Sequence, residues 1–162
     1  MEMMNMVLMS MGAFFAVLDS LTMLVDMAKN VKGLKQFMRG TITNARKKLE
    51  RKAERKVFNG VVYMLLITQV VLLINMIATA NSCGMVAITH VLSVTLVLFV
   101  YTSIRNMVLV KDTVSQKVID FAMKFIMLDT SVILFVNIGQ LLCVGTFIYC
   151  LVTNIQINMI AV

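Results

Sequence analysis

Two carboxylates interrupt the apolar N-terminal segment of this chain. Asp19 and Asp26 are seven residues apart, so they share one face of a helix. An ionisable group inside a membrane-spanning segment is costly and usually serves a function, which makes Asp19 a candidate functional residue. We expect Asp26 to pair with a lysine at the level of the lipid headgroups. For Asp19, such a pair is as good an explanation as a functional role. The available lysines are Lys29, Lys32 and Lys35.

Neutral polar side chains form a stripe along the last apolar segment. They recur at spacings of three or four residues, which places them on one slowly drifting face of a helix. The members are Asn137, Gln140, Cys143, Thr146, Cys150 and Thr153. Such a stripe either joins helices through hydrogen bonds or lines a water-filled path, and joining is the commoner use. Together with Asp19, the candidate pore-lining or intramembrane polar residues are Asn75, His90, Asn137 and Gln140.

His90 is the only histidine in the chain. No Cys, His or carboxylate stands at metal-ligand spacing from it, so we expect no metal site. Its expected role is a hydrogen bond to Thr or Ser on another helix, with proton sensing as the alternative. The sequence contains no Gly-rich phosphate loop, no Gly-x-Ser-x-Gly motif and no nucleophile with a suitable base. We therefore expect no cofactor, no catalytic residue and no enzymatic activity.

The composition indicates which elements hold these residues. Hydrophobic residues make up 60% of the 162 positions, charged residues make up 14%, and the mean hydropathy is +0.91. Soluble domains contain roughly 45–50% apolar and about 25% charged residues, so we do not expect an ordinary soluble enzyme. Proline is absent, which allows long unbroken helices. The sequence predicts an all-α integral membrane protein in which residues 1–162 form a single membrane domain.

Gaps between the charged residues locate four membrane spans. No charge occurs from Val57 to Ile104, which leaves room for two spans of about 20 residues each and a turn at 81–84. A second uncharged stretch runs from Thr130 to the C-terminus and supplies another span. We predict long transmembrane helices in two hairpins, at 3–25, 60–80, 85–104 and 131–153. Alternatively, residues 3–27 lie along the membrane surface as an amphipathic helix.

The 15 Lys and Arg residues are sorted into two connectors, 29–56 and 105–128. Most of them lie in the first connector, at Lys29, Lys32, Lys35, Arg39, Arg46, Lys47, Lys48, Arg51, Lys52, Arg55 and Lys56. With four spans, both connectors share one side of the membrane, and the opposite side carries no Lys or Arg. Because positively charged loops remain in the cytoplasm, we predict that both connectors are cytoplasmic and that both termini are non-cytoplasmic.

The basic segment 29–56 has three competing interpretations. The first is a solvated helix that contacts anionic lipid headgroups. The second is a ring of cations at the mouth of a pore that several copies form together. The third is nucleic-acid binding, which is the least favoured because no aromatic platform or base-reading motif accompanies the charge. Strong helix formers in residues 44–57 predict a basic helix that continues into the second span.

A short repeat and a resemblance extend this picture. The string INMIA occurs at Ile74–Ala78 and again at Ile157–Ala161, which indicates either an internal duplication or chance similarity between apolar segments. Residues 3–80 place a basic loop between two apolar helices whose outer ends lie on the non-cytoplasmic side. In outline this layout resembles the conjugative pilin family, whose subunits are small helical hairpins. The resemblance implies a hairpin subunit of a helical filament.

The sequence therefore favours two functions. The leading expectation is a non-enzymatic oligomeric membrane protein that forms a pore or channel. The alternative is a structural subunit of a larger membrane complex or helical filament, in which the same polar groups join helices. The expected partners are anionic membrane lipids and either other copies of the chain or different membrane subunits.

Overall fold

The computed structural model describes residues 2–29, 52–110, 126–153 and 155–157, and this described part is all-helical apart from turns and short irregular segments. The prediction of an all-α fold is confirmed for these residues. The helices are α1 (Glu2–Lys29), α3 (Lys52–Ser82), α4 (Val86–Val110) and α6 (Ile126–Val152). Each contains a segment long and apolar enough to cross a membrane: Met3–Lys29, Tyr63–Ser82, Val86–Arg105 and Ser131–Val152. These segments overlap the four predicted spans.

The predicted basic helix joins the second span without a break. The helix α3 already includes Lys52 and runs through Lys56 into the apolar segment that begins at Tyr63. Lys, Arg, Glu and Ala all favour helix, and no proline interrupts them, which explains why the helix starts before the apolar run. The rest of the predicted basic helix, 44–51, lies outside the described residues.

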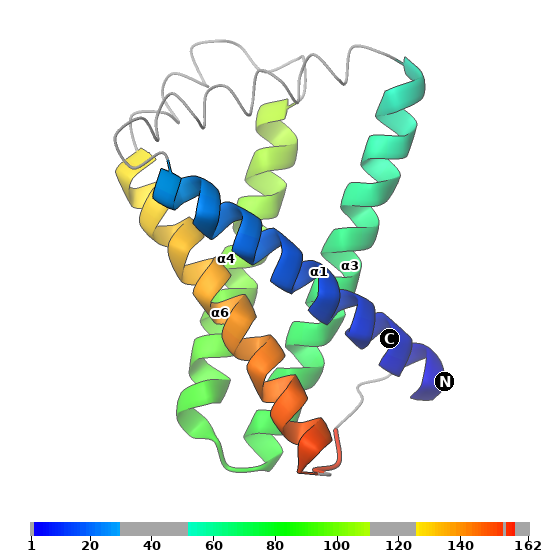
Figure 1. Cartoon of the computed structure of the whole chain (residues 1–162), viewed down its shortest axis with the longest axis vertical. Helices are drawn as coiled ribbons and strands as arrows, with labels where there is room; N and C mark the ends of the chain where they lie inside the picture. Colours follow the sequence, from blue (N-terminus) through cyan, green and yellow to red (C-terminus); the bar gives the residue numbers. More distant parts are fainter. Residues whose placement is uncertain (1, 30–51, 111–125, 154, 158–162) are drawn as a thin grey trace.

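The four helices form a packed ring. The helix α1 packs against α3 and α6, α4 packs against the same two helices, and α3 and α6 also meet across the centre. Figure 1 shows α3 and α4 running side by side, with α1 crossing the bundle obliquely. Because each helix has two main neighbours, the ring is continuous, and the arrangement in two hairpins stays a prediction.

The turn between α3 and α4 occurs where the sequence predicts it. The amide of Met85 donates to the carbonyl of Ala80 at 2.8 Å, and the amide of Gly84 donates to the carbonyl of Asn81 at 3.1 Å. These two bonds define a Schellman motif, which requires a left-handed residue after the helix end. Gly84 supplies it with a φ of 70°, a conformation that strains any residue with a Cβ. The chain thereby reverses within a few residues.

Helix ends divide into two groups along the bundle. The end of α1, the start of α3, the end of α4 and the start of α6 lie together at the upper end in Figure 1. The α3–α4 turn and the end of α6 lie at the lower end. The start of α1 lies on this lower side as well. The helix ends that border both basic connectors therefore share one end of the bundle.

Apolar side chains occupy both the core and the outer surface. Met9, Leu72, Met76 and Leu92 are fully buried in one cluster that all four helices reach. Large apolar side chains are also widely exposed on the outside, and Val97 of α4 keeps 67% of its surface. A bundle that is apolar inside and outside has the surface expected of a membrane-embedded protein.

The two INMIA strings occupy different structural positions. Ile74–Ala78 lies within α3 and contributes buried side chains. Ile157 lies beyond the end of α6 in an irregular segment, and the remainder of the second string is outside the described residues. The described portion therefore gives no support to a structural duplication.

Candidate interhelical polar site

A buried chain of hydrogen bonds links three helices. The hydroxyl of Ser20 in α1 donates to Oε1 of Gln140 in α6 at 3.0 Å. The amide Nε2 of Gln140 then donates to Oε1 of Gln69 in α3 at 2.6 Å. All three side chains are buried, with Gln140 only 2% exposed. Because a buried amide without partners is costly, these bonds favour the arrangement in which α1, α3 and α6 converge.

Small residues allow α1 to reach this point. Gly12, Ala16 and Ser20 follow one another at four-residue spacing and all face inward. A Cβ at Gly12 would collide with the backbone carbonyl oxygen of Thr68 and would stand 3.2 Å from the Cβ of Leu72. The helices α1 and α3 therefore touch almost backbone to backbone, and Ser20 on the same side of α1 bonds to Gln140 of α6.

A second close approach holds α6 against α4. A Cβ at Gly139 would collide with the hydroxyl of Thr95 and would lie 2.7 Å from its Cγ2. Gly139 directly precedes Gln140 in sequence. The same turn of α6 therefore packs tightly on α4 while its next residue bonds to α1 and α3, which fixes the position of the Gln140 amide.

The predicted polar stripe of α6 faces the inside of the bundle. Five members are buried and Thr153 is exposed at the helix end. The buried members are Asn137, Gln140, Cys143, Thr146 and Cys150. Their side chains therefore pack against the other helices of the same chain instead of forming an outer polar face.

Several buried polar groups bond to their own helix. Nδ2 of Asn137 donates to the carbonyl of Ile133 at 2.7 Å, and Nδ2 of Asn75 donates to the carbonyl of Val71 at 2.8 Å. The hydroxyl of Thr146 likewise donates to the carbonyl of Leu142 at 2.9 Å. Such back-bonding satisfies donors without water, so these residues fit a dry helical interior.

The two ionisable candidates lie on the outside. His90 is exposed on α4, and its side chain makes no hydrogen bond to another described residue, so the expected bond to Thr or Ser is not found there. Asp19 is exposed on α1, next to the inward Ser20. Because α1 and α4 are not principal neighbours in the ring, the structure does not bring Asp19 and His90 together.

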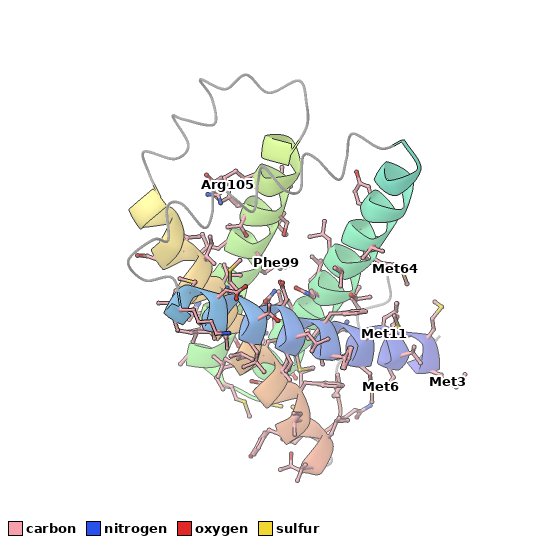
Figure 2. The ribbon with its side chains drawn as sticks, turned by 45° about the horizontal axis from the view of Figure 1, so that its top comes forward. Met3, Met6, Met11, Met64, Phe99 and Arg105 are labelled. Carbon is pink, nitrogen blue, oxygen red and sulfur yellow. The ribbon has the colours of Figure 1, made fainter. Side chains whose placement is uncertain are left out.

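The basic candidates are only partly described. Lys29 is exposed at the end of α1, and Lys52, Arg55 and Lys56 belong to the first turns of α3. The others lie outside the described residues: Lys32, Lys35, Arg39, Arg46, Lys47, Lys48 and Arg51. Arg105, from the second basic connector, is half-buried on α4, far from Met3 at the opposite end (Figure 2).

Sequence reasoning missed the small-residue face of α1 and the role of Ser20. The signal was present as Gly-x-x-x-Ala-x-x-x-Ser at Gly12–Ser20, a spacing typical of closely packed transmembrane helices. Within the described ranges, no group of three or more His, Cys, Asp or Glu could hold a metal ion. No protein-family model matches the chain, and no curated protein or solved structure matches it either.

Proposed function

We propose that this chain is a multi-pass membrane protein and acts as a non-enzymatic structural subunit of a larger membrane assembly. The observation that carries the proposal is the use of its polar side chains. Hydrogen bonds among Ser20, Gln69 and Gln140 join three helices of the same chain. A structural role predicts this use of polar side chains as links between helices.

The distribution of tyrosines supports insertion in a bilayer. Tyr63 and Tyr101 are exposed towards the end of the bundle that carries the basic residues, and Tyr149 is exposed towards the other end. Tyrosine prefers the two membrane–water interfaces. From Tyr63 to Ser82, α3 rises roughly 30 Å at 1.5 Å per residue, which is close to the thickness of a hydrocarbon core.

The sorting of charge supports an orientation. The end of α1 at Lys29, the start of α3 at Lys52 and the end of α4 at Val110 lie at one end of the bundle, and Arg105 is near this end of α4. Under the positive-inside rule this end is cytoplasmic, and the α3–α4 turn is on the other side. The basic connectors then lie beside the inner leaflet, where Lys and Arg attract anionic lipid headgroups.

The geometry favours a structural subunit over a pore. A pore shared by several copies needs polar groups on an outer face of each copy. Asn75, Asn137 and Gln140 are instead buried within one chain, and Asp19 and His90 lie on helices that are not principal neighbours. These five residues therefore do not form one outward polar face.

One observation favours a pore as the second candidate. Asp19 is exposed on the side of α1, where lipid solvates a carboxylate poorly and a water-filled path between copies would solvate it well. In this arrangement copies of α1 surround the path. The charge preference of such a path would then be set by Asp19 and the basic mouth.

Two measurements separate these functions. The full chain is extracted from its own membrane in mild detergent, and its mass and composition are determined. A structural subunit comes out with fixed partner chains, whereas a lone monodisperse particle contradicts this function. In parallel, the purified chain is placed in liposomes at high density. Ion flux that is lost in Asp19→Asn favours the pore, and tight vesicles exclude it.

A further inference from the structure

The outer face of α1 is an apolar helix surface with one carboxylate beside it. This face is defined by the exposed residues Met4, Val7, Phe14, Leu18, Leu21 and Val25. Their spacings of three, four and seven residues match the pattern by which one long helix packs along another. Asp19 is exposed on the flank of α1, between this face and the side that carries the buried Gly12.

Asp19 lies near the middle depth of the bundle. Its neighbour Ser20 bonds to Gln140, which is close to the centre of the span Ser131–Val152. Lys29, at the end of α1, is ten residues further on, or roughly 15 Å along the helix axis. The carboxylate is therefore too deep for this lysine to reach it along the helix.

No described residue of the chain neutralises this carboxylate. Asp19 makes no hydrogen bond or ion pair with any other residue of the described ranges. A carboxylate that faces the interior of a bilayer is costly unless a cation or a strong donor covers it. A partner that supplies positive charge at the depth of Asp19 would remove this cost.

A second copy of this chain does not supply that charge. All 15 Lys and Arg residues of the sequence lie in segments 29–56 and 105–124, which are outside the middle of the four apolar segments. In copies with the same orientation, Asp19 would instead meet Asp19, which is unfavourable. His90 is close to the opposite end, four residues after the start of α4.

We propose that the outer face of α1 docks a membrane-spanning helix of a different protein that carries Lys or Arg near its middle, with Asp19 as the partner of this cation. This inference rests on the proposed function as a structural subunit and defines the chemistry of its partner. The apolar residues of the outer face pack along the incoming helix, and the ion pair fixes its depth.

The test uses a synthetic leucine-rich transmembrane helix with one central Lys as the probe. Cys83 is exposed whereas Cys143 and Cys150 are buried, so a fluorophore on Cys83 reports association of the full chain with a labelled helix in vesicles. We expect the central-Lys helix to bind, and an all-Leu helix or one with Lys at its end to bind about tenfold more weakly.

Variants of the chain test the role of Asp19 itself. Asp19→Leu should lower the affinity for the central-Lys helix about tenfold and leave the affinity for the all-Leu helix unchanged. Thr22→Val, an exposed change one turn away, is the matched control and should bind like the original chain. Asp19→Lys should restore binding to a helix with a central Asp. If Asp19→Leu does not fold, Asp19→Asn replaces it in the same binding test, because it removes the charge and keeps a polar side chain.

Three results would overturn the inference. These are equal binding of the Lys and Leu helices, binding of the Lys helix that is independent of Asp19, and self-association of labelled copies that is lost in Asp19→Leu. Failure of the proposed function is seen separately, because the native chain would then leave its own membrane without partner chains. If the chain binds the Lys helix but leaves its native membrane without partner chains, the proposed function is contradicted and the docking surface on α1 is still supported.

Discussion

Gln140 of α6 and Gln69 of α3 share a side-chain hydrogen bond of 2.6 Å at the centre of the bundle. These helices lie diagonally across the ring, and their contact is less extensive than that of adjacent helices. Ser20 of α1 extends the bond to a third helix. A single amide therefore connects α3 and α6 across the ring and joins α1 to both.

Removing this amide should destabilise the bundle through lost bonds between helices. Gln140→Leu keeps most of the side-chain volume but leaves the Gln69 amide and the Ser20 hydroxyl without their partner. We expect a loss of about 1–2 kcal/mol in the free energy of unfolding in detergent. The double variant with Gln69→Leu should cost less than the sum of the two single changes. Thr146→Val is the control, because among the described residues its hydroxyl bonds to the backbone carbonyl of Leu142 in its own helix and to no other helix. Strict additivity of the two Gln changes would contradict a direct bond.

Enlarging Gly12 should separate α1 from α3. A side chain at this position collides with the carbonyl oxygen of Thr68, and a backbone atom cannot rotate away. We expect Gly12→Val to destabilise the fold by about 1–3 kcal/mol, measured by thermal unfolding in detergent. Gly145→Val is the matched control in α6, since a Cβ there meets nothing within 4 Å. Equal losses for both variants would show that the helices do not approach closely at Gly12.

Replacing Gly84 should strain the turn between α3 and α4. Its φ of 70° disfavours any residue with a Cβ, although there is free space around it. We expect Gly84→Ala to cost about 1–2 kcal/mol in the free energy of unfolding. Gly60→Ala, in α3 with equally open surroundings, should leave stability unchanged or raise it, because alanine favours helix. A Gly84→Ala variant as stable as Gly60→Ala would exclude the left-handed turn.

The three cysteines should differ sharply in reactivity. Cys83 is exposed in the turn, whereas Cys143 and Cys150 are buried in α6. A membrane-impermeant maleimide should modify Cys83 alone in intact vesicles, and only from the side opposite the basic connectors. In a Cys83→Ser background labelling should disappear, and Thr43→Cys in the first connector should then react from the other side. Labelling of Cys83 and of Cys at position 43 from the same side would refute the orientation.

The elements of this fold could be read from the sequence because their cause is local. Charge-free stretches from Val57 to Ile104 and after Thr130, together with the lack of proline, define where long apolar helices form. The turn at 81–84 was readable for the same reason, since Gly84 is required by the backbone conformation there. The positions of the connectors were readable too, because Lys and Arg cluster between the apolar stretches.

The faces of the helices could not be read from the sequence. Asp19 and Ser20 are adjacent, but successive residues point about 100° apart around a helix, so one faces outward and the other joins the buried hydrogen bonds. In segments that are apolar on all sides, no polar–apolar contrast indicates which face is buried. Asn75, Asn137 and Gln140 were therefore equally compatible with a pore wall and with a bundle interior.

The sequence by itself determined four apolar helices, the turn between α3 and α4 and the end of the bundle that carries the positive charge, because composition and charge spacing act residue by residue. Only the tertiary structure decided that Gln69 and Gln140 meet, that Gly12 admits α1 to the bundle and that Asp19 remains outside. These outcomes depend on how closely two helix backbones can approach, which is set by the pairing of small residues across an interface and not by any one segment alone.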